Sequence, residues 1–143
     1  MKGPTRPWDL TELRLLVELP ALRKLADRGL CDAELAVVRK LANATMRSAR
    51  SGDGASYRRA DMAFHLYLLE LTGDPALAEV ARLLHARGVT NAQESAHLMS
   101  AEAREHGELV TMLTEEMISA ADDLLRCHIL GRGGQRALTW PSA

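Results

Sequence analysis

Four side chains that commonly bind metal ions, Asp61, His65, His106 and His128, occur in three segments whose apolar spacing is typical of helices. Asp61 and His65 are four residues apart, so in a helix they stand on the same face, one above the other. The carboxylate oxygen and the imidazole nitrogen can then reach a single ion. Because His106 and His128 also fall on apolar stripes, we predict that the four residues form one metal site inside a helical bundle, beside a cavity.

Three imidazoles and one carboxylate suit a divalent transition metal of borderline softness. We favour zinc or nickel, with manganese, cobalt and iron as alternatives. Four ligands in a closed tetrahedron would make a purely structural site. The same ligands in part of an octahedron would leave positions open for water or for a bound carboxylate. Both geometries are compatible with the sequence.

Each of these signals is weak when taken alone. An Asp and a His four residues apart more often form a hydrogen-bonded pair on a helix surface, and a single histidine on an apolar stripe is more often a core residue. His85 lies beside Arg82, and His97 lies in an irregular stretch. We interpret both as surface residues or as residues that contact the ligands, and His97 is the best substitute ligand.

The sequence offers little for catalysis. No serine or cysteine sits in a recognisable nucleophile elbow, and no glycine-rich phosphate loop follows a strand. Glu102, Glu105 and Glu108 flank His106 and could help a metal to activate water, but glutamates on an exposed helix face are common. We predict that the chain is not an enzyme. A metal-dependent enzyme acting on a small carboxylic acid and a metal-free helical interaction module remain the alternatives.

Length and composition indicate one helical domain. The chain has 143 residues, of which 47% are hydrophobic and 26% are charged, and its formal net charge is −1. Ala, Leu, Arg and Glu dominate, whereas Ile, Val and aromatic residues are scarce, which favours helices over strands. No apolar run is long enough for a membrane span, and the N-terminus lacks the apolar core of a signal peptide. We therefore expect a cytoplasmic, all-α protein with no membrane contact.

Helix signals divide the chain into segments that could position the four ligands. We expect a first helix from Asp9 or Thr11 to Gly29, kinked or broken at Pro20, and a second helix that starts at Asp32. Turns are expected at residues 51–54 and 72–75, which enclose a third helix carrying Asp61 and His65. A fourth helix begins near Pro75, with its apolar side chains Leu77, Val80, Ala81 and Leu84 facing inward. Ser100 is expected to cap the fifth helix.

The segment from His106 to His128 decides whether a single site can form. A continuous helix over this interval would hold the two histidines about 33 Å apart. Both could not then bind one ion in the same chain. A single site therefore requires a turn, and we expect it near Glu116 to Ala121.

Several motifs in order resemble the FCD (FadR C-terminal) domain, the effector-binding domain of GntR-type bacterial transcription regulators. The motifs are Asp9-Leu10-Thr11-Glu12-Leu13-Arg14, then Asp61-x-x-Phe64-His65, Thr72-Gly73-Asp74-Pro75, Glu105-His106 and His128. The resemblance covers residues 9–131, and the 22-residue interval from His106 to His128 is typical of the family. One departure is Glu116-Met117, where the family usually has a Gly-Asp turn.

The resemblance implies an antiparallel bundle of about six or seven helices that encloses a central metal and ligand pocket. In the metal-binding branch of the family, one Asp and three His hold a divalent ion, and Asp61, His65, His106 and His128 match them one by one. A small organic acid, often a sugar acid or hydroxy acid, binds beside the ion. Arg14 matches an arginine that commonly faces the pocket and could bind the effector carboxylate. The alternative for Arg14 is a surface residue paired with Glu18.

The resemblance also implies how such a domain is used. We expect residues 1–8 to be a linker or leader and residues 132–143 to be a flexible tail. The family's domains pair, so we expect a homodimer. DNA would be bound only through a winged-helix domain, which is absent from these 143 residues.

Overall fold

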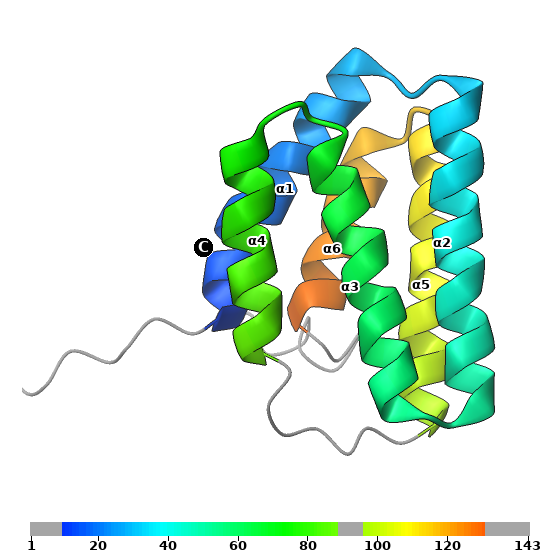
Figure 1. Ribbon diagram of the computed structural model, residues 1–143. Helices are drawn as coiled ribbons and strands as arrows, with labels where there is room; N and C mark the ends of the chain where they lie inside the picture. The colour runs from blue at the N-terminus through cyan, green and yellow to red at the C-terminus, as the bar shows by residue number, and fades with distance from the viewer. Residues whose placement is uncertain (1–9, 89–95, 131–143) are drawn as a thin grey trace, which may run out of the picture.

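The computed structural model describes residues 10–88 and 96–130, and these ranges contain six helices. The helices are α1 (Leu10–Arg28), α2 (Asp32–Ser51), α3 (Gly54–Glu70), α4 (Pro75–Gly88), α5 (Ala96–Thr114) and α6 (Ile118–Leu130). They run up and down beside one another as an antiparallel bundle (Figure 1). No strand occurs in the described ranges, so the predicted all-α fold is confirmed.

Two sets of helices make up the bundle. α1 packs against α4 and α6, whereas α2 packs against α3 and α5 (Figure 1). Contacts between α3 and α4 and between α5 and α6 join the two sets. The main core lies between them and includes Leu22, Leu25, Val38, Phe64, Leu109 and Leu125. Helices α3, α5 and α6, which carry the four predicted ligands, all contribute to this core.

Local sequence explains the ends of α3. Asp53 precedes the helix, and its carboxylate accepts hydrogen bonds from the backbone N–H groups of Ala55 and Ser56 at 3.0 and 3.3 Å. Gly73 follows the helix with a φ of 78°, a left-handed conformation that glycine adopts without steric cost. These observations confirm the turns expected at residues 51–54 and 72–75. They also fix the length of the helix that carries Asp61 and His65.

The turn that a single metal site requires lies between α5 and α6. α5 ends at Thr114 and α6 begins at Ile118, so the expectation of a turn near Glu116 is confirmed. Glu116 has a φ of 57°, a left-handed conformation that residues other than glycine uncommonly adopt. The backbone N–H of Met117 donates to the carbonyl oxygen of Met112 at 2.8 Å, which closes the turn. The reversal brings His128 back along His106.

The sequence predicted that the first helix is either kinked or broken at Pro20, and the structure rules out the break. α1 runs through this residue without interruption. Pro20 is exposed, as is Leu16 one turn earlier. The carbonyl group that loses its backbone partner at a proline can therefore hydrogen-bond to water, which lowers the cost of proline inside a helix.

Two other predictions about helix positions are wrong. Ser100 is inside α5, which begins at Ala96, because Met99 is buried against Ala49 and Tyr57 and extends the helix. Val80 was expected to face inward but is exposed. The small residues Ala81, as predicted, and Ala78 face the interior, where they allow close packing, and His85 follows on the same face of α4.

Several predictions concern residues outside the described ranges. These are the linker or leader at residues 1–8, the cap at Asp9 and the tail at residues 132–143. Among the described helices, none is long and apolar enough to cross a membrane.

Candidate metal centre

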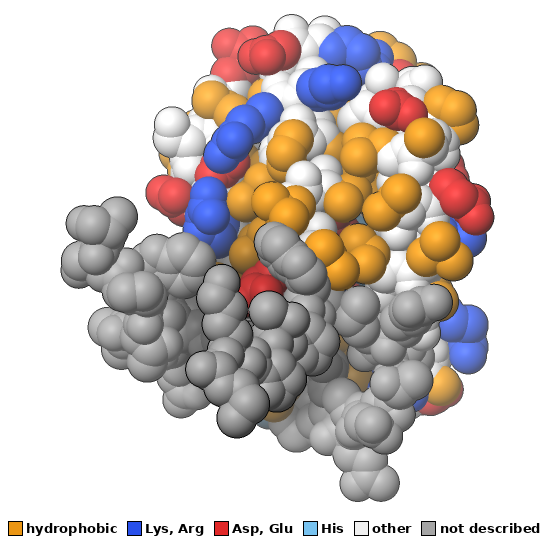
Figure 2. Space-filling view, turned by 90° about the vertical axis from the view of Figure 1, so that its left-hand side faces the viewer, with side chains coloured by type: hydrophobic (Ala, Val, Ile, Leu, Met, Phe, Trp, Pro, Cys, Tyr) orange, Lys and Arg blue, Asp and Glu red, His pale blue; other side chains and the backbone are white. Residues whose placement is uncertain are grey.

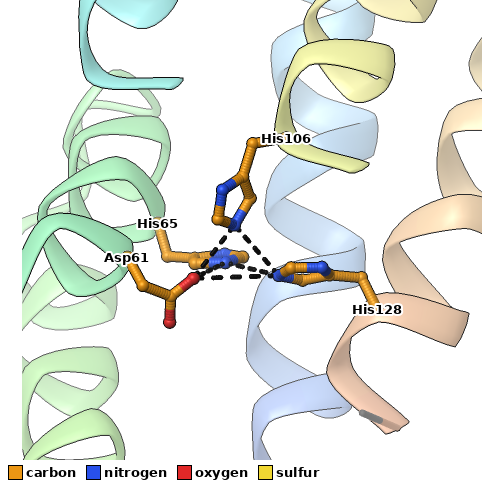
Figure 3. Close-up of side chains that lie close together, drawn as sticks. All are labelled: Asp61, His65, His106 and His128. Carbon is orange, nitrogen blue, oxygen red and sulfur yellow. Dashed lines mark hydrogen bonds and ion pairs between the residues drawn. The ribbon is translucent and has the colours of Figure 1, made fainter. Parts of the chain in front are cut away.

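The four predicted ligands converge on one point. Asp61 and His65 project from the same face of α3, His106 projects from α5, and His128 projects from α6 (Figure 3). One ligand atom from each side chain lies within 4.8 Å of all the others. The three histidines are buried, and Asp61 is partly buried.

The distances between the ligand atoms fit a single ion. Asp61 Oδ1 lies 2.9 Å from His106 Nε2 and 3.2 Å from His65 Nε2. His128 Nε2 lies 3.0 Å from His65 Nε2 and 3.1 Å from His106 Nε2. The longest of these distances, from His128 Nε2 to Asp61 Oδ1, is 3.8 Å. Two atoms about 2.1 Å from one ion are about 3.0 Å apart at a right angle and about 3.4 Å apart at the tetrahedral angle, so both geometries are compatible with the site.

The environment of Asp61 Oδ1 is a second indication that the site binds a cation. This oxygen is buried and has no hydrogen-bond partner of good geometry, although three imidazole nitrogens surround it. A buried carboxylate oxygen without a partner is costly. A divalent ion between Oδ1 and the three nitrogens would satisfy it.

The outer nitrogen of each ligand histidine faces an oxygen atom from another helix. His106 Nδ1 lies 2.9 Å from Thr45 Oγ1, and that hydroxyl donates its own proton to the carbonyl oxygen of Ala42. Thr45 Oγ1 therefore accepts from His106 Nδ1–H, which leaves the Nε2 lone pair directed at the centre. Metal-bound histidines usually have such a partner on the second nitrogen.

The other two histidines have carboxylates at the same position. His65 Nδ1 lies 3.4 Å from Glu18 Oε1, and His128 Nδ1 lies 3.8 Å from Glu105 Oε1. Both distances exceed that of an ordinary hydrogen bond, so these contacts act mainly through charge. Thr45, Glu18 and Glu105 come from α2, α1 and α5, respectively, so nearly the whole bundle supports the centre.

The protonation states differ among the three histidines. Burial lowers the pKa of His65 to about 3, although Glu18 and Asp61 oppose this effect, and burial together with His128 lowers the pKa of His106. Burial also acts to lower the pKa of His128, but the carboxylates of Asp61 and Glu105 outweigh it and raise the pKa to about 9. Without a metal ion, the centre therefore holds a proton on His128 and two neutral imidazoles.

These pKa shifts predict that the metal-free protein is less stable in acid. Between pH 6.5 and about 3, an unfolded chain binds a proton on His65 that the native state excludes, so the free energy of unfolding falls as the pH falls. The expected slope is about 1.4 kcal/mol per pH unit for each such group. Burial of His106 adds to the effect, and the raised pKa of His128 leaves its contribution constant below pH 6.5.

Urea unfolding in EDTA at several pH values between 7 and 4 measures this slope. The His97→Ala variant is the control, because His97 is exposed and its removal should leave the slope unchanged. A free energy of unfolding that stays constant from pH 6.5 to pH 4 would contradict the burial of neutral imidazoles.

Arg14 lies beside the centre but contacts a different residue. Its Nη2 lies 3.1 Å from Glu18 Oε2, and its Nε is buried without a hydrogen-bond partner. The alternative prediction for Arg14 was a surface residue paired with Glu18. The pair is present, but Arg14 is partly buried. The unpartnered Nε leaves one donor available.

Four residues that support the centre were missed or only partly predicted from the sequence. His85 was expected either on the surface or against the ligands; it is buried, its ring centroid lies 5.4 Å from that of His65, and its Nε2 lies 2.9 Å from Glu18 Oε1. Glu105 is partly buried beside His128, whereas the flanking glutamates were interpreted as exposed. Thr45 was not considered, and Glu18 was considered only as a partner of Arg14, yet each interrupts an otherwise apolar stripe of its helix, which is a signal for a buried polar contact.

Comparisons with known proteins agree with this architecture. A family model of the FCD domain matches residues 9–131. GntR of Streptococcus agalactiae has a similar structure, with a TM-score of 0.72 at 25% identity over 86% of this chain and 56% of that chain. McbR/YncC of E. coli is similar in fold, with a TM-score of 0.75 at 18% identity over 91% of this chain and 61% of that chain. No curated protein matches the sequence.

The chain spans less than two thirds of the length of both solved structures. The family model nevertheless matches most of the chain, and the bundle has the same fold as these neighbours. The chain therefore belongs to the FCD family, the effector-binding regulatory domains of GntR-type transcription regulators.

Proposed function

We propose that this domain senses a small organic acid with the help of one divalent transition metal ion held by Asp61, His65, His106 and His128. The observation that carries the proposal is the orientation of the three histidines. Their Nε2 atoms face one another and Asp61, while each Nδ1 faces an oxygen atom. Once a metal ion displaces the proton on His128, this arrangement directs three nitrogen lone pairs at one point, which is what a divalent metal needs.

Zinc or nickel suits this ligand set best, and manganese, cobalt or iron is compatible with it. A bound ion would supply a positive charge that attracts the carboxylate of the effector. Arg14, which is partly buried and pairs with Glu18, would contribute a second positive charge. Sugar acids and hydroxy acids are the classes of effector that the family resemblance favours.

The effector would act by population shift. An acid that binds one arrangement of the bundle better than another shifts the equilibrium by the difference in its two affinities. A DNA-binding winged-helix domain attached to such a bundle would then change its affinity for DNA. A regulator of this kind acts in the cytoplasm.

A thermal-shift screen tests the proposed function. Metal-free protein prepared without a metal-affinity resin is heated with zinc, with each acid, and with both together. A ligand at a hundred times its Kd adds about 2.7 kcal/mol to stability. We expect zinc to raise Tm by several degrees, and a cognate acid to raise it further only when zinc is present.

The Arg14→Lys variant separates the two binding events. It should keep most of the shift caused by zinc, because lysine retains the positive charge beside Glu18, and it should lose most of the additional shift caused by the acid, because lysine cannot form the bidentate contact. An acid that is consumed, with turnover that stops on chelation, would indicate the metal-dependent enzyme instead. A chain whose Tm responds to neither zinc nor any acid would be a metal-free interaction module.

A dimer is the second part of the proposal, and one face of the bundle supports it. Leu16 on α1 and Val80 and Leu83 on α4 are 61%, 45% and 55% exposed. α1 and α4 pack against each other, and Figure 2 shows hydrophobic side chains gathered over the face that they form. Exposed apolar patches of this kind commonly mark protein interfaces. A second copy of the chain is the partner that the family resemblance favours.

Leu83→Glu should weaken this dimer. Placing a charge in an apolar interface leaves it buried and unpaired, so we expect the dimer dissociation constant to rise at least about tenfold, equivalent to about 1.4 kcal/mol. Sedimentation velocity over a dilution series measures the constant. Val37→Glu is the control, because Val37 is an exposed apolar residue on α2, away from α4. Equal weakening by both variants, or none by Leu83→Glu, would rule out this face.

A further inference from the structure

A second polar cluster lies directly behind the metal centre, where α1, α3 and α4 meet. Glu18 Oε1 lies 2.9 Å from His85 Nε2 and 3.4 Å from His65 Nδ1. Glu18 Oε2 lies 3.1 Å from Arg14 Nη2. Glu18, His65 and His85 are all buried, with Glu18 only 4% exposed.

The directions of the hydrogen atoms follow from the chemistry of the groups. An ionised carboxylate only accepts, so His85 must donate its Nε2–H to Glu18. His65 Nε2 faces the metal centre, so the hydrogen of a neutral His65 belongs on Nδ1, which faces Glu18. The pairing with Arg14 offsets the cost of burying the charge of Glu18.

We propose that Glu18 is the positioning residue of the metal centre, that it fixes the rotation and tautomer of His65, and that His85 and Arg14 hold Glu18 in place. This inference rests on the proposed metal site. Glu18 touches no metal itself but acts through His65. It gives His65 the carboxylate partner that metal-bound histidines commonly have, and it links the ligand to α1 and α4.

The same three residues could in principle hold an ion of their own, because their ligand atoms lie within 4.8 Å of one another. Two features argue against this use. The guanidinium of Arg14 already pairs with Glu18 and would repel a second cation. His65 would also have to lose its remaining ring proton to bind two ions at once. We therefore expect one ion per chain.

Cobalt(II) titration of the metal-free protein tests this role. The Glu18→Gln variant keeps the size of the side chain and an oxygen atom facing His65 but loses the charge, whereas Glu18→Ala removes the whole carboxylate. Removing such a partner typically weakens metal binding about 10- to 100-fold. We expect losses in this range, larger in Glu18→Ala, together with a shift in the visible absorption bands of bound cobalt. Glu79→Gln is the control, because Glu79 is an exposed glutamate paired with Arg82 on the surface.

The His85→Leu variant provides a second test in case Glu18→Ala does not fold. It retains Glu18 and Arg14 but removes one donor to Oε1, so we expect a severalfold loss of cobalt affinity and a smaller spectral shift. Circular dichroism of the metal-free variants shows whether the fold is intact.

The possible results separate this inference from the proposed function. If the unaltered protein binds one cobalt ion and the Glu18 and His85 variants bind it as tightly, Glu18 has no positioning role but the metal site stands. Two ions per chain would show that Glu18 is a ligand and would overturn the inference. No cobalt binding by the unaltered protein would overturn the metal site and the inference together.

Discussion

The His106→Ala and His128→Ala variants are expected to lose essentially all bound zinc, with affinity reduced by more than about a hundredfold. Loss of a residue that only supports a ligand already costs about 10- to 100-fold, so loss of a ligand should cost more. His106 and His128 come from different helices and are both buried, so each variant leaves a gap in the interior where a ligand nitrogen stood. Competition with a chelator of known affinity measures the change.

His97→Ala is the matched control. It removes a histidine from the same helix as His106, but His97 is exposed. Its zinc affinity should equal that of the unaltered protein. If His128→Ala retains the unaltered zinc affinity, the ion is held elsewhere and the proposed site is wrong.

Phe64→Ala is expected to have the largest effect on stability. Phe64 is buried in the main core, its ring centroid lies 4.4 Å from that of His106, and it meets His65 edge to face at 5.4 Å. Truncating a buried phenylalanine to alanine typically costs about 3–5 kcal/mol. The cavity would also free the two imidazoles to rotate, so we expect zinc affinity to fall as well.

Urea unfolding of metal-free protein measures the stability effect separately from metal binding. Phe64→Leu fills most of the volume and should cost less than about 1.5 kcal/mol. Val37→Ala, at an exposed position, should change stability by less than about 0.5 kcal/mol. A loss below 1 kcal/mol in Phe64→Ala would show that the ring does not contribute to the core as its burial indicates.

Sequence patterns predicted those parts of the centre that depend on local spacing. Asp61 and His65 could be paired because a separation of four residues places them on one helix face. The turn between His106 and His128 was expected because a straight helix would keep the two histidines apart. Glu116 adopts a left-handed conformation, so the turn forms at this position without a glycine.

Contacts between distant helices could not be predicted in the same way. Glu18 and His85 are 67 residues apart, and their contact depends on which faces of α1 and α4 meet. The inward face of α4 was assigned to Leu77, Val80, Ala81 and Leu84; Ala81 does face inward, but Val80 is exposed, whereas Ala78 and His85 are buried. The predicted face therefore did not include His85, which contacts Glu18. Apolar spacing favoured the larger Val80, whereas close packing places the small Ala78 inside.

The break considered at Pro20 and the cap predicted at Ser100 are absent for a related reason, because local preferences yield to packing. A proline on the solvent side of α1 costs less than a buried one. Burial of Met99 extends α5 past the serine that was expected to cap it. Tertiary context can therefore outweigh the tendency of a proline to interrupt a helix or of a serine to cap one.

Anomalous diffraction from crystals of the zinc-loaded protein, recorded on both sides of the zinc absorption edge, tests the proposed centre most directly. We expect one peak per chain, about 2.0–2.2 Å from Asp61 Oδ1 and from Nε2 of His65, His106 and His128. The absence of a peak at this position, or a peak between Glu18 and His85 alone, would contradict the assignment of these four side chains as the metal ligands.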